Sequence, residues 1–219
     1  MEPRSLLPRL VLAASVVAGV SYVASWDMPL SEVQSLTWKG LGVGLLALYA
    51  ALTARGRDGW LICAVLAFGA LGDVLLGAIS LTVGALAFLA GHLIAIGLYW
   101  RNRRPSPSTS QRLLAIVLVP ATVIIAYLLP TDRAMAPGIA LYSLGLSLMA
   151  AAAWVSRFPR FKTGIGAVMF VVSDLFIFAR EGPLSGVAWV GLAVWGLYYL
   201  GQLLICLGVT GKLARDPPV

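Results

Sequence analysis

Apolar stretches alternate with short polar segments along this chain, and eight of the stretches are long enough to span a membrane. At 1.5 Å of rise per residue, about 20 apolar residues of helix cross a hydrocarbon core of roughly 30 Å. The pattern therefore predicts an all-α fold, a polytopic bundle of eight transmembrane helices. The predicted spans are 6–25, 36–54, 60–79, 81–100, 112–129, 135–155, 163–180 and 186–208.

The boundary between the third and fourth spans is the least distinct one. Only Ser80 and Thr82 interrupt the apolar block there. Two helices joined by a very tight turn fit a bilayer better than one helix that is too long for it. Since the other connections are also short, we expect residues 1–219 to form a single integral membrane domain.

The basic residues predict the orientation of these spans. If the eight spans cross in turn, 13 of the 16 Lys and Arg residues fall on one side of the membrane. These are Arg4, Arg9, Arg55, Arg57, Arg101, Arg103, Arg104, Arg112, Arg157, Arg160, Lys162, Lys212 and Arg215, whereas Lys39, Arg133 and Arg180 fall on the other side. Because basic residues concentrate in cytoplasmic loops, both termini are predicted to be cytoplasmic.

Composition excludes several classes of protein. The chain is 60% apolar and 11% charged, with a mean hydropathy of +0.91, whereas a soluble domain carries about 25% charged residues. The net charge of +7 is explained by membrane orientation, so we expect no nucleic-acid partner. Cys63 and Cys206 lie inside apolar runs and are expected to be packing residues. With one His and two Cys, no zinc site and no cofactor are expected.

The first predicted span and the segment 101–112 each need a separate interpretation. Arg4 and Arg9 before Leu10–Val20 resemble a secretory signal peptide, but no soluble exported domain follows, so we favour a retained first helix. The segment 101–112 (RNRRPSPSTSQR) is the longest polar connection, and its Ser and Pro content is typical of a flexible loop.

Three ionisable residues lie well inside the predicted spans: Asp73, His92 and Asp174. Counting along the helices places both Asp residues about 9 Å below the outer end and His92 roughly 16 Å deep. The three could therefore share one layer in the outer half of the bundle. Ionisable groups at such depth are costly and usually functional.

Each candidate also has a purely structural explanation. A buried Asp can cap a neighbouring helix or bond a hydroxyl, and a lone His can be a satisfied packing residue. The same holds for the other polar residues of the spans: Tyr142 and Tyr198 as packing aromatics, Lys39 as a snorkelling anchor and Ser173 as a small helix-packing residue. Two acids at one depth favour function over packing.

Paired buried carboxyls suggest acid catalysis. Two carboxyls in one site of low dielectric resist ionising together, so one can donate a proton while the other faces a developing cation, as in glycosidases. A nucleophilic arrangement of Ser173, His92 and Asp73 for ester cleavage is also conceivable. It is weaker because no G-x-S-x-G elbow is present. A proton relay in a transporter would use the same residue types.

Three segments resemble the YhhN family of lysoplasmalogenases in order and spacing: 68–76 (FGALGDVLL), 88–99 (FLAGHLIAIGLY) and 166–174 (GAVMFVVSD). Three further positions fit more loosely, namely Lys39, Tyr142 with Met149, and Tyr198–Gln202 (YYLGQ). The resemblance covers about residues 36–208. One departure is Gly40, where the family commonly has Pro.

The resemblance implies hydrolysis of the vinyl-ether bond of lysoplasmalogens to a fatty aldehyde and a glycerophospho-alcohol. It implies a core of Asp73, His92 and Asp174, surrounded by Lys39, Tyr142, Tyr198 and Gln202; Ser173 is a further substrate-binding candidate. Protonation at carbon gives an oxocarbenium ion, to which water adds, so the reaction needs a positioned acid and an anion but no metal. We expect one Asp to donate the proton, His92 to orient water or the carboxyl, and Lys39 to pair with the substrate phosphate.

Two alternatives remain open at this point, a hydrolase of another lysolipid and a proton-coupled transporter of a lipid or small molecule. The broken helices of many secondary transporters are not evident in the sequence. The expected partners are a lysophospholipid substrate and membrane lipids. A composition rich in Ala, Gly and Arg is typical of a bacterial cytoplasmic membrane protein.

Overall fold

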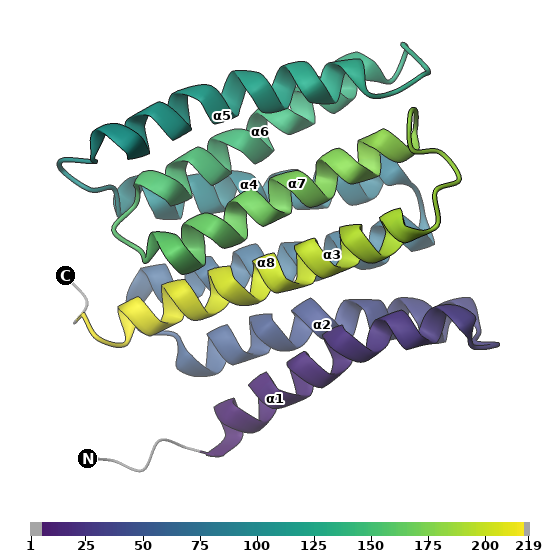
Figure 1. Cartoon of the computed structure of the whole chain (residues 1–219). Coiled ribbons are helices and arrows are strands. Elements are labelled where there is room, and N and C mark those ends of the chain that lie inside the picture. Colours follow the sequence, from purple (N-terminus) through teal and green to yellow (C-terminus); the bar gives the residue numbers. More distant parts are fainter. Residues whose placement is uncertain (1–5, 217–219) are drawn as a thin grey trace. The chain divides into compact units, whose positions relative to one another are not determined.

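The computed structural model describes residues 6–216; Arg4, counted above in the orientation, lies outside the described residues. Among the described residues, eight helices are long and apolar enough to cross a membrane, which confirms the predicted fold class (Figure 1). The elements are α1 (Leu6–Ser21), η1 (Tyr22–Asp27), α2 (Glu32–Thr53), α3 (Gly56–Ala78), α4 (Leu81–Arg101), α5 (Thr109–Leu128), α6 (Ala136–Val155), η2 (Arg160–Gly164), α7 (Ile165–Arg180) and α8 (Trp189–Leu213). The cytoplasmic placement of the termini stays a prediction.

Two helices begin earlier than their apolar runs because polar residues cap them. The Ser31 backbone N–H donates to Gln34 Oε1 over 2.9 Å, and the Gln34 backbone N–H donates to Ser31 Oγ over 3.3 Å. Ser108 and Gln111 form the same reciprocal pair ahead of α5. Each capping box satisfies two backbone groups that the first turn of a helix leaves without partners. As a result, α2 and α5 begin three or four residues before the predicted spans.

The turn between α3 and α4 is as tight as the sequence suggested. Helix α3 ends at Ala78 and α4 begins at Leu81. The Val83 backbone N–H donates to Ser80 Oγ over 3.2 Å, which caps the new helix. Close behind the turn, a methyl group placed on Gly84 would lie 2.6 Å from Leu76 Cβ, so only a glycine lets the two helices approach this closely.

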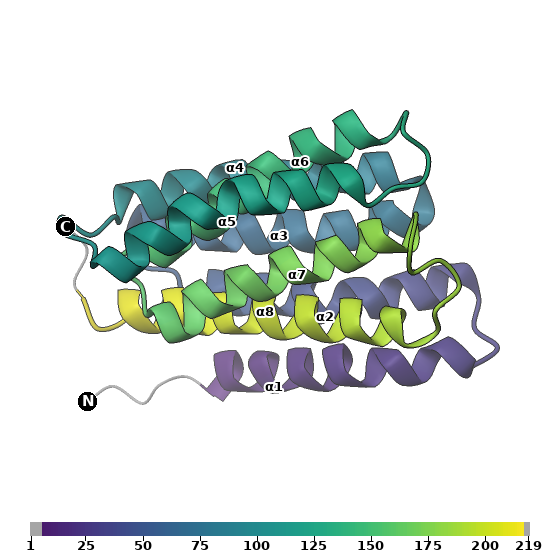
Figure 2. The same cartoon turned by 45° about the horizontal axis from the view of Figure 1, so that its top comes forward.

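The described chain forms two compact units. Among the described residues, the first unit comprises 6–94 and 210–216, and the second comprises 95–209. In the first unit α1 packs against α2 and α2 packs against α3, as Figures 1 and 2 show. Ser15 Oγ donates to the Gly42 carbonyl over 2.7 Å, which ties α1 to the middle of α2.

In the second unit α5 packs on α6, and α6 packs on η2 and α7 (Figure 2). Helices α7 and α8 approach closely where a glycine of one meets a glycine of the other. A methyl group on Gly166 would lie 2.6 Å from the Gly201 carbonyl oxygen, and one on Gly201 would lie 2.7 Å from the Gly166 carbonyl oxygen. Small residues of this kind let helix backbones pack directly in a membrane.

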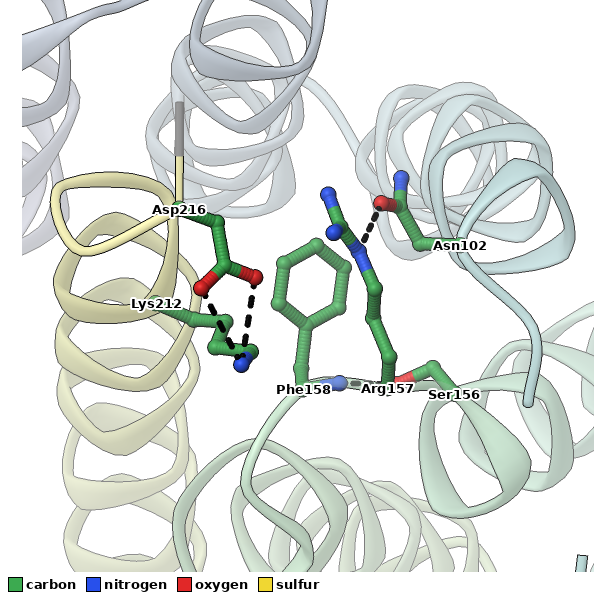
Figure 3. Close-up of polar contacts among 6 residues, drawn as sticks. All are labelled: Asn102, Ser156, Arg157, Phe158, Lys212 and Asp216. Atoms are coloured by element: carbon green, nitrogen blue, oxygen red, sulfur yellow. Dashed lines mark hydrogen bonds and ion pairs between the residues drawn. The ribbon is translucent and has the colours of Figure 1, made fainter. Parts of the chain in front are cut away.

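The two ends of the polar segment after α4 are bonded to residues at and after the end of α6, while the flexibility expected from its composition stays a prediction. Arg157 Nε donates to Asn102 Oδ1 over 2.6 Å (Figure 3), and the Arg157 backbone N–H donates to the Asn102 carbonyl. Arg104 Nε donates to the Ser156 carbonyl over 2.8 Å, and Gln111 Nε2 donates to the Trp154 carbonyl. The partners lie more than 40 residues away, so the composition of the segment alone could not reveal them.

The close approach of α7 and α8 leads us to predict how a larger residue at Gly166 changes the stability of the protein. Gly166→Ala is expected to destabilise the protein by about 1–3 kcal/mol, because the added methyl group meets backbone that cannot rotate away. The measurement is the thermal unfolding midpoint in detergent. Gly196→Ala, on α8, is the matched control, since its methyl group meets nothing within 4 Å. Equal midpoints for the two variants would contradict the packing described above.

Candidate functional site

Asp174 on α7 is held by a tyrosine on α6. Tyr142 Oη donates to Asp174 Oδ2 over 2.6 Å, and the two residues are 8% and 5% exposed. This length is typical of a hydroxyl bonded to a carboxylate. The Tyr142 ring also packs edge-on against Phe178, at 5.9 Å between centroids. One oxygen of the Asp174 carboxyl is therefore fixed by a buried donor.

Ser173 is adjacent to Asp174 in the sequence but bonds in a different direction. Its Oγ donates to the Val194 carbonyl of α8 over 2.9 Å. The hydroxyl hydrogen is thus engaged in joining α7 to α8. This bond favours a packing role for Ser173 and gives no support to its use as a nucleophile.

Tyr198 and Gln202 on α8 lie at other depths than Asp174. The Tyr198 ring packs edge-on against Phe170 at 5.0 Å between centroids. The contacts of Ser173 with Val194 and of Gly166 with Gly201 fix how α8 is aligned along α7. In this alignment Gln202 of α8 is level with Ile165 of α7. That level is nine residues from Asp174, or roughly 13 Å along the helix.

Gln202 is 2% exposed, and its Oε1 has no hydrogen-bond partner among the residues that the structure describes. A buried amide oxygen without a partner is costly, which distinguishes Gln202 from an ordinary packing residue. The separation from Asp174 within the second unit means that Gln202 does not contact the Tyr142–Asp174 pair directly.

Asp73 and His92 belong to the first unit, on α3 and α4, and each is 3% exposed. A methyl group on Gly72 would lie 2.8 Å from the Phe88 ring, which brings the two helices together beside Asp73. In this register His92 is level with Phe68, five residues from Asp73. His92 therefore lies roughly 7 Å farther along the hairpin, away from its turn.

Lys39 lies well inside α2 and not at its start. Because the capping box moves the start of α2 to Glu32, Lys39 is seven residues into the helix and half-buried. A methyl group on Gly40 would lie 2.9 Å from Val74 Cγ2, and this contact places Lys39 level with Leu75, two residues beyond Asp73. Gly40 thus lies inside a continuous helix.

The sequence analysis missed Tyr22, in the turn η1. Its side chain interacts with those of Trp26 and Ser35, and the charge of Asp73 has a smaller electrostatic effect on its hydroxyl. These relations depend on how α1, α2 and α3 pack, and no local pattern indicated them. The sequence analysis placed this segment only at the end of the first predicted span, 6–25.

The two cysteines and the possible metal ligands were the other features considered in the sequence. Cys206 is buried and Cys63 is half-buried, as expected for packing residues. Across residues 6–216, no group of three or more His, Cys, Asp or Glu side chains is arranged to hold a metal ion.

Comparison with known proteins decides the family. The sequence model of the YhhN family matches residues 34–209, which is most of the chain. The chain belongs to the YhhN family. The match confirms the resemblance carried by the segments around Asp73, His92 and Asp174, and with the eight apolar helices it makes this YhhN chain an integral membrane protein.

Two curated relatives of this YhhN chain carry the name lysoplasmalogenase. One is from Mycobacterium bovis and the other from Mycobacterium tuberculosis. Each is 29% identical over 230 residues, covering 94% of this chain and 87% of the relative. No solved structure matches this chain.

Proposed function

We propose that this YhhN protein is a membrane hydrolase that cleaves the vinyl-ether bond of lysoplasmalogens. Two relatives named lysoplasmalogenase, similar over nearly the whole chain, support this reaction. The structural observation that carries the proposal is the burial of two acids, Asp73 and Asp174. Each lies five or six residues before the C-terminal end of its helix, at Ala78 and Arg180.

The reaction begins with transfer of a proton to the vinyl carbon, which leaves an oxocarbenium ion. Water adds to this ion and releases a proton, and the hemiacetal then collapses to a fatty aldehyde and a glycerophospho-alcohol. The transition state gains positive charge, so it requires a proton donor and a nearby anion. None of these reaction steps consumes a cofactor.

The hydrogen bonds suggest how the two acids divide these roles. The Tyr142 hydroxyl donates to Asp174, and such a donor stabilises the negative charge of a carboxylate. We therefore assign to Asp174 the anion that faces the oxocarbenium ion, and to Asp73 the proton donor. His92 is assigned to orienting the water or the carboxyl.

Lys39 is assigned to the substrate phosphate. Its level on α2, two residues beyond that of Asp73, keeps the ammonium group in the same half of its unit as the proposed proton donor. An ammonium group attracts a phosphate as a compact point charge.

One assay tests the proposed reaction directly. The purified protein in detergent is incubated with a lysoplasmalogen, and long-chain aldehyde is measured with and without a metal chelator. We expect aldehyde in both cases. A lack of aldehyde would contradict the proposal. Release of free fatty acid from an ester analogue, with no aldehyde from the vinyl ether, would instead assign the protein to another lysolipid.

Tyr142→Phe is expected to reduce aldehyde release about tenfold or more. The variant keeps the ring and its contact with Phe178 but removes the donor to Asp174, and hydrogen bonds to charged groups contribute about 1.5–3 kcal/mol. The control is Tyr127→Phe. Tyr127 lies on α5, and its exposed ring lies beneath the guanidinium group of Arg133. The assignment of Asp174 as the anion is wrong if both variants retain full activity.

A further inference from the structure

We propose that the second unit binds the headgroups of anionic phospholipids at the end where α4 and α6 finish and α5 and η2 begin. This binding is independent of the proposed hydrolysis. The residues that carry it, called the basic cluster below, are Arg103, Arg104, Arg112, Arg160 and Lys162. Three features support the site: the contacts that gather these cations, their lack of ion pairs, and two exposed aromatic rings beside them.

The first feature is a set of hydrogen bonds between segments that lie far apart in the sequence. The chain just after α4 pairs antiparallel with the chain just after α6. The Arg104 backbone N–H donates to the Val155 carbonyl over 3.2 Å, and Arg103 and Ser156 form a bridge. Arg104 Nε also donates to the Ser156 carbonyl over 2.8 Å. The guanidinium group of Arg104 is therefore held against the segment that leads into η2.

The two elements that begin at this end are tied to α6 through Trp154. Gln111 Nε2 donates to the Trp154 carbonyl over 3.0 Å, at the residue directly before Arg112. A methyl group on Gly164 would lie 2.7 Å from Trp154 Cε3, so η2, with its two cations, packs against the same tryptophan. The five cations of the basic cluster therefore surround one junction of α4, α5, α6 and η2.

The second feature is that the protein does not neutralise these charges. None of the five cations forms an ion pair with another residue in the described part of the chain. The acidic residues of the second unit all belong to the opposite half of its helices: Asp132, Asp174 and Glu181. Arg160 and Lys162 also lie in the first turn of the helical segment Arg160–Arg180, where the helix dipole disfavours cations. A bound anion would relieve this repulsion.

The third feature is an exposed aromatic ring beneath each of two arginines. Arg103 Cζ lies 5.3 Å from the centroid of the Trp100 ring, and Arg160 Cζ lies 4.8 Å from that of Phe161. Trp100 is 63% exposed and Phe161 is 69% exposed. Exposed aromatic rings at the ends of membrane helices, tryptophan above all, lie at the level of the lipid headgroups. At this level a guanidinium group meets phosphate, which it binds by charge-assisted hydrogen bonds.

An excess of cations at one end of a bundle can also serve only to orient the chain during membrane insertion. That role depends on the number of positive charges on one side and involves no bound lipid. A headgroup site binds anionic lipid in the folded protein and depends on particular cations. Lipid binding by the purified protein therefore distinguishes the two roles.

The experiment titrates the purified protein, in neutral detergent, with phosphatidylglycerol. The comparison ligands are phosphatidylcholine with the same acyl chains and inorganic phosphate. Because a ligand of the folded state raises the thermal unfolding midpoint, the midpoint reports binding. We expect phosphatidylglycerol to raise it at concentrations about tenfold lower than phosphatidylcholine does, and inorganic phosphate to give no shift at those concentrations. Equal responses to the two lipids would overturn the proposal, as would an equal response to inorganic phosphate.

Single variants test whether the basic cluster carries the binding. Arg160→Gln and Arg104→Gln are each expected to weaken phosphatidylglycerol binding about fivefold, the contribution of one cation near an anionic lipid surface. The control is Arg180→Gln, which removes an equal charge at the other end of the same helical segment and is expected to bind as the wild type does.

The Arg160 side chain forms no hydrogen bond within the described residues, so Arg160→Gln decides the question even if Arg104→Gln unfolds through the loss of its bond to Ser156. Unchanged binding in Arg160→Gln would overturn the proposal. An equal loss in Arg160→Gln and Arg180→Gln would also overturn it, because the attraction would then come from net charge alone.

Discussion

Asp174→Asn is expected to lower aldehyde release by a factor of about 10²–10⁴, the range that a positioned acid–base or charge-stabilising group contributes. The amide has nearly the shape of the carboxyl, and its oxygen can still accept the hydrogen bond from Tyr142. What the variant loses is the negative charge opposite the developing oxocarbenium ion. The measurement is kcat for aldehyde release, taken together with the thermal unfolding midpoint.

The matched control for this variant is Glu181→Gln. Glu181 directly follows α7 and is exposed, so its substitution removes one negative charge close to the same helix end without entering the packed region. We expect its activity to equal that of the wild type. Full activity in Asp174→Asn would remove this residue from the mechanism, and equal losses in both variants would point to a general effect of charge at that end of α7.

Asp73→Asn is expected to reduce aldehyde release to a similar extent, but for a different reason. In the proposed roles Asp73 supplies the proton that forms the new C–H bond, and an amide cannot supply it at a useful rate. The variant should fold about as well as the wild type, because the amide is neutral and has nearly the shape of the protonated carboxyl that it replaces. Aldehyde release and the unfolding midpoint should therefore change independently.

Asp58→Asn provides the control on the same helix. Asp58 lies in the first turn of α3, fifteen residues before Asp73 and at the opposite end of the span. Its substitution is expected to leave aldehyde release unchanged. If Asp73→Asn is as active as Asp58→Asn, the proton must come from another group. Asp174 would then be the remaining buried acid of the proposed site.

The helices could be predicted well because membrane spans are defined by length and hydropathy, which are local properties. Errors occurred where polar residues extend a helix. The capping pair of Ser31 and Gln34 lengthens α2 beyond its apolar run, and this moved Lys39 from the expected helix start to a position seven residues inside it. A hydropathy pattern does not include such polar first turns.

The candidate site could be predicted only as a set of residues. Asp73, His92 and Asp174 were recognisable because ionisable groups are rare at membrane depth. The partner of Asp174 depends on a contact between helices, because Tyr142 is 32 residues from Asp174 along the chain. The register of α7 against α8 also sets how far Gln202 lies from Asp174. None of these relations has a local signature in the sequence.

The bond between Asn102 and Arg157 has a mechanical consequence. It joins the residue that directly follows α4 to the residues between α6 and η2, through both backbone and side-chain groups. A displacement of one of these elements is therefore transmitted to the other through the hydrogen bonds between Asn102 and Arg157. Because this connection bypasses the Pro and Ser residues at 105–107, Asn102 and Arg157 themselves set the spacing of the two elements at that end of the second unit.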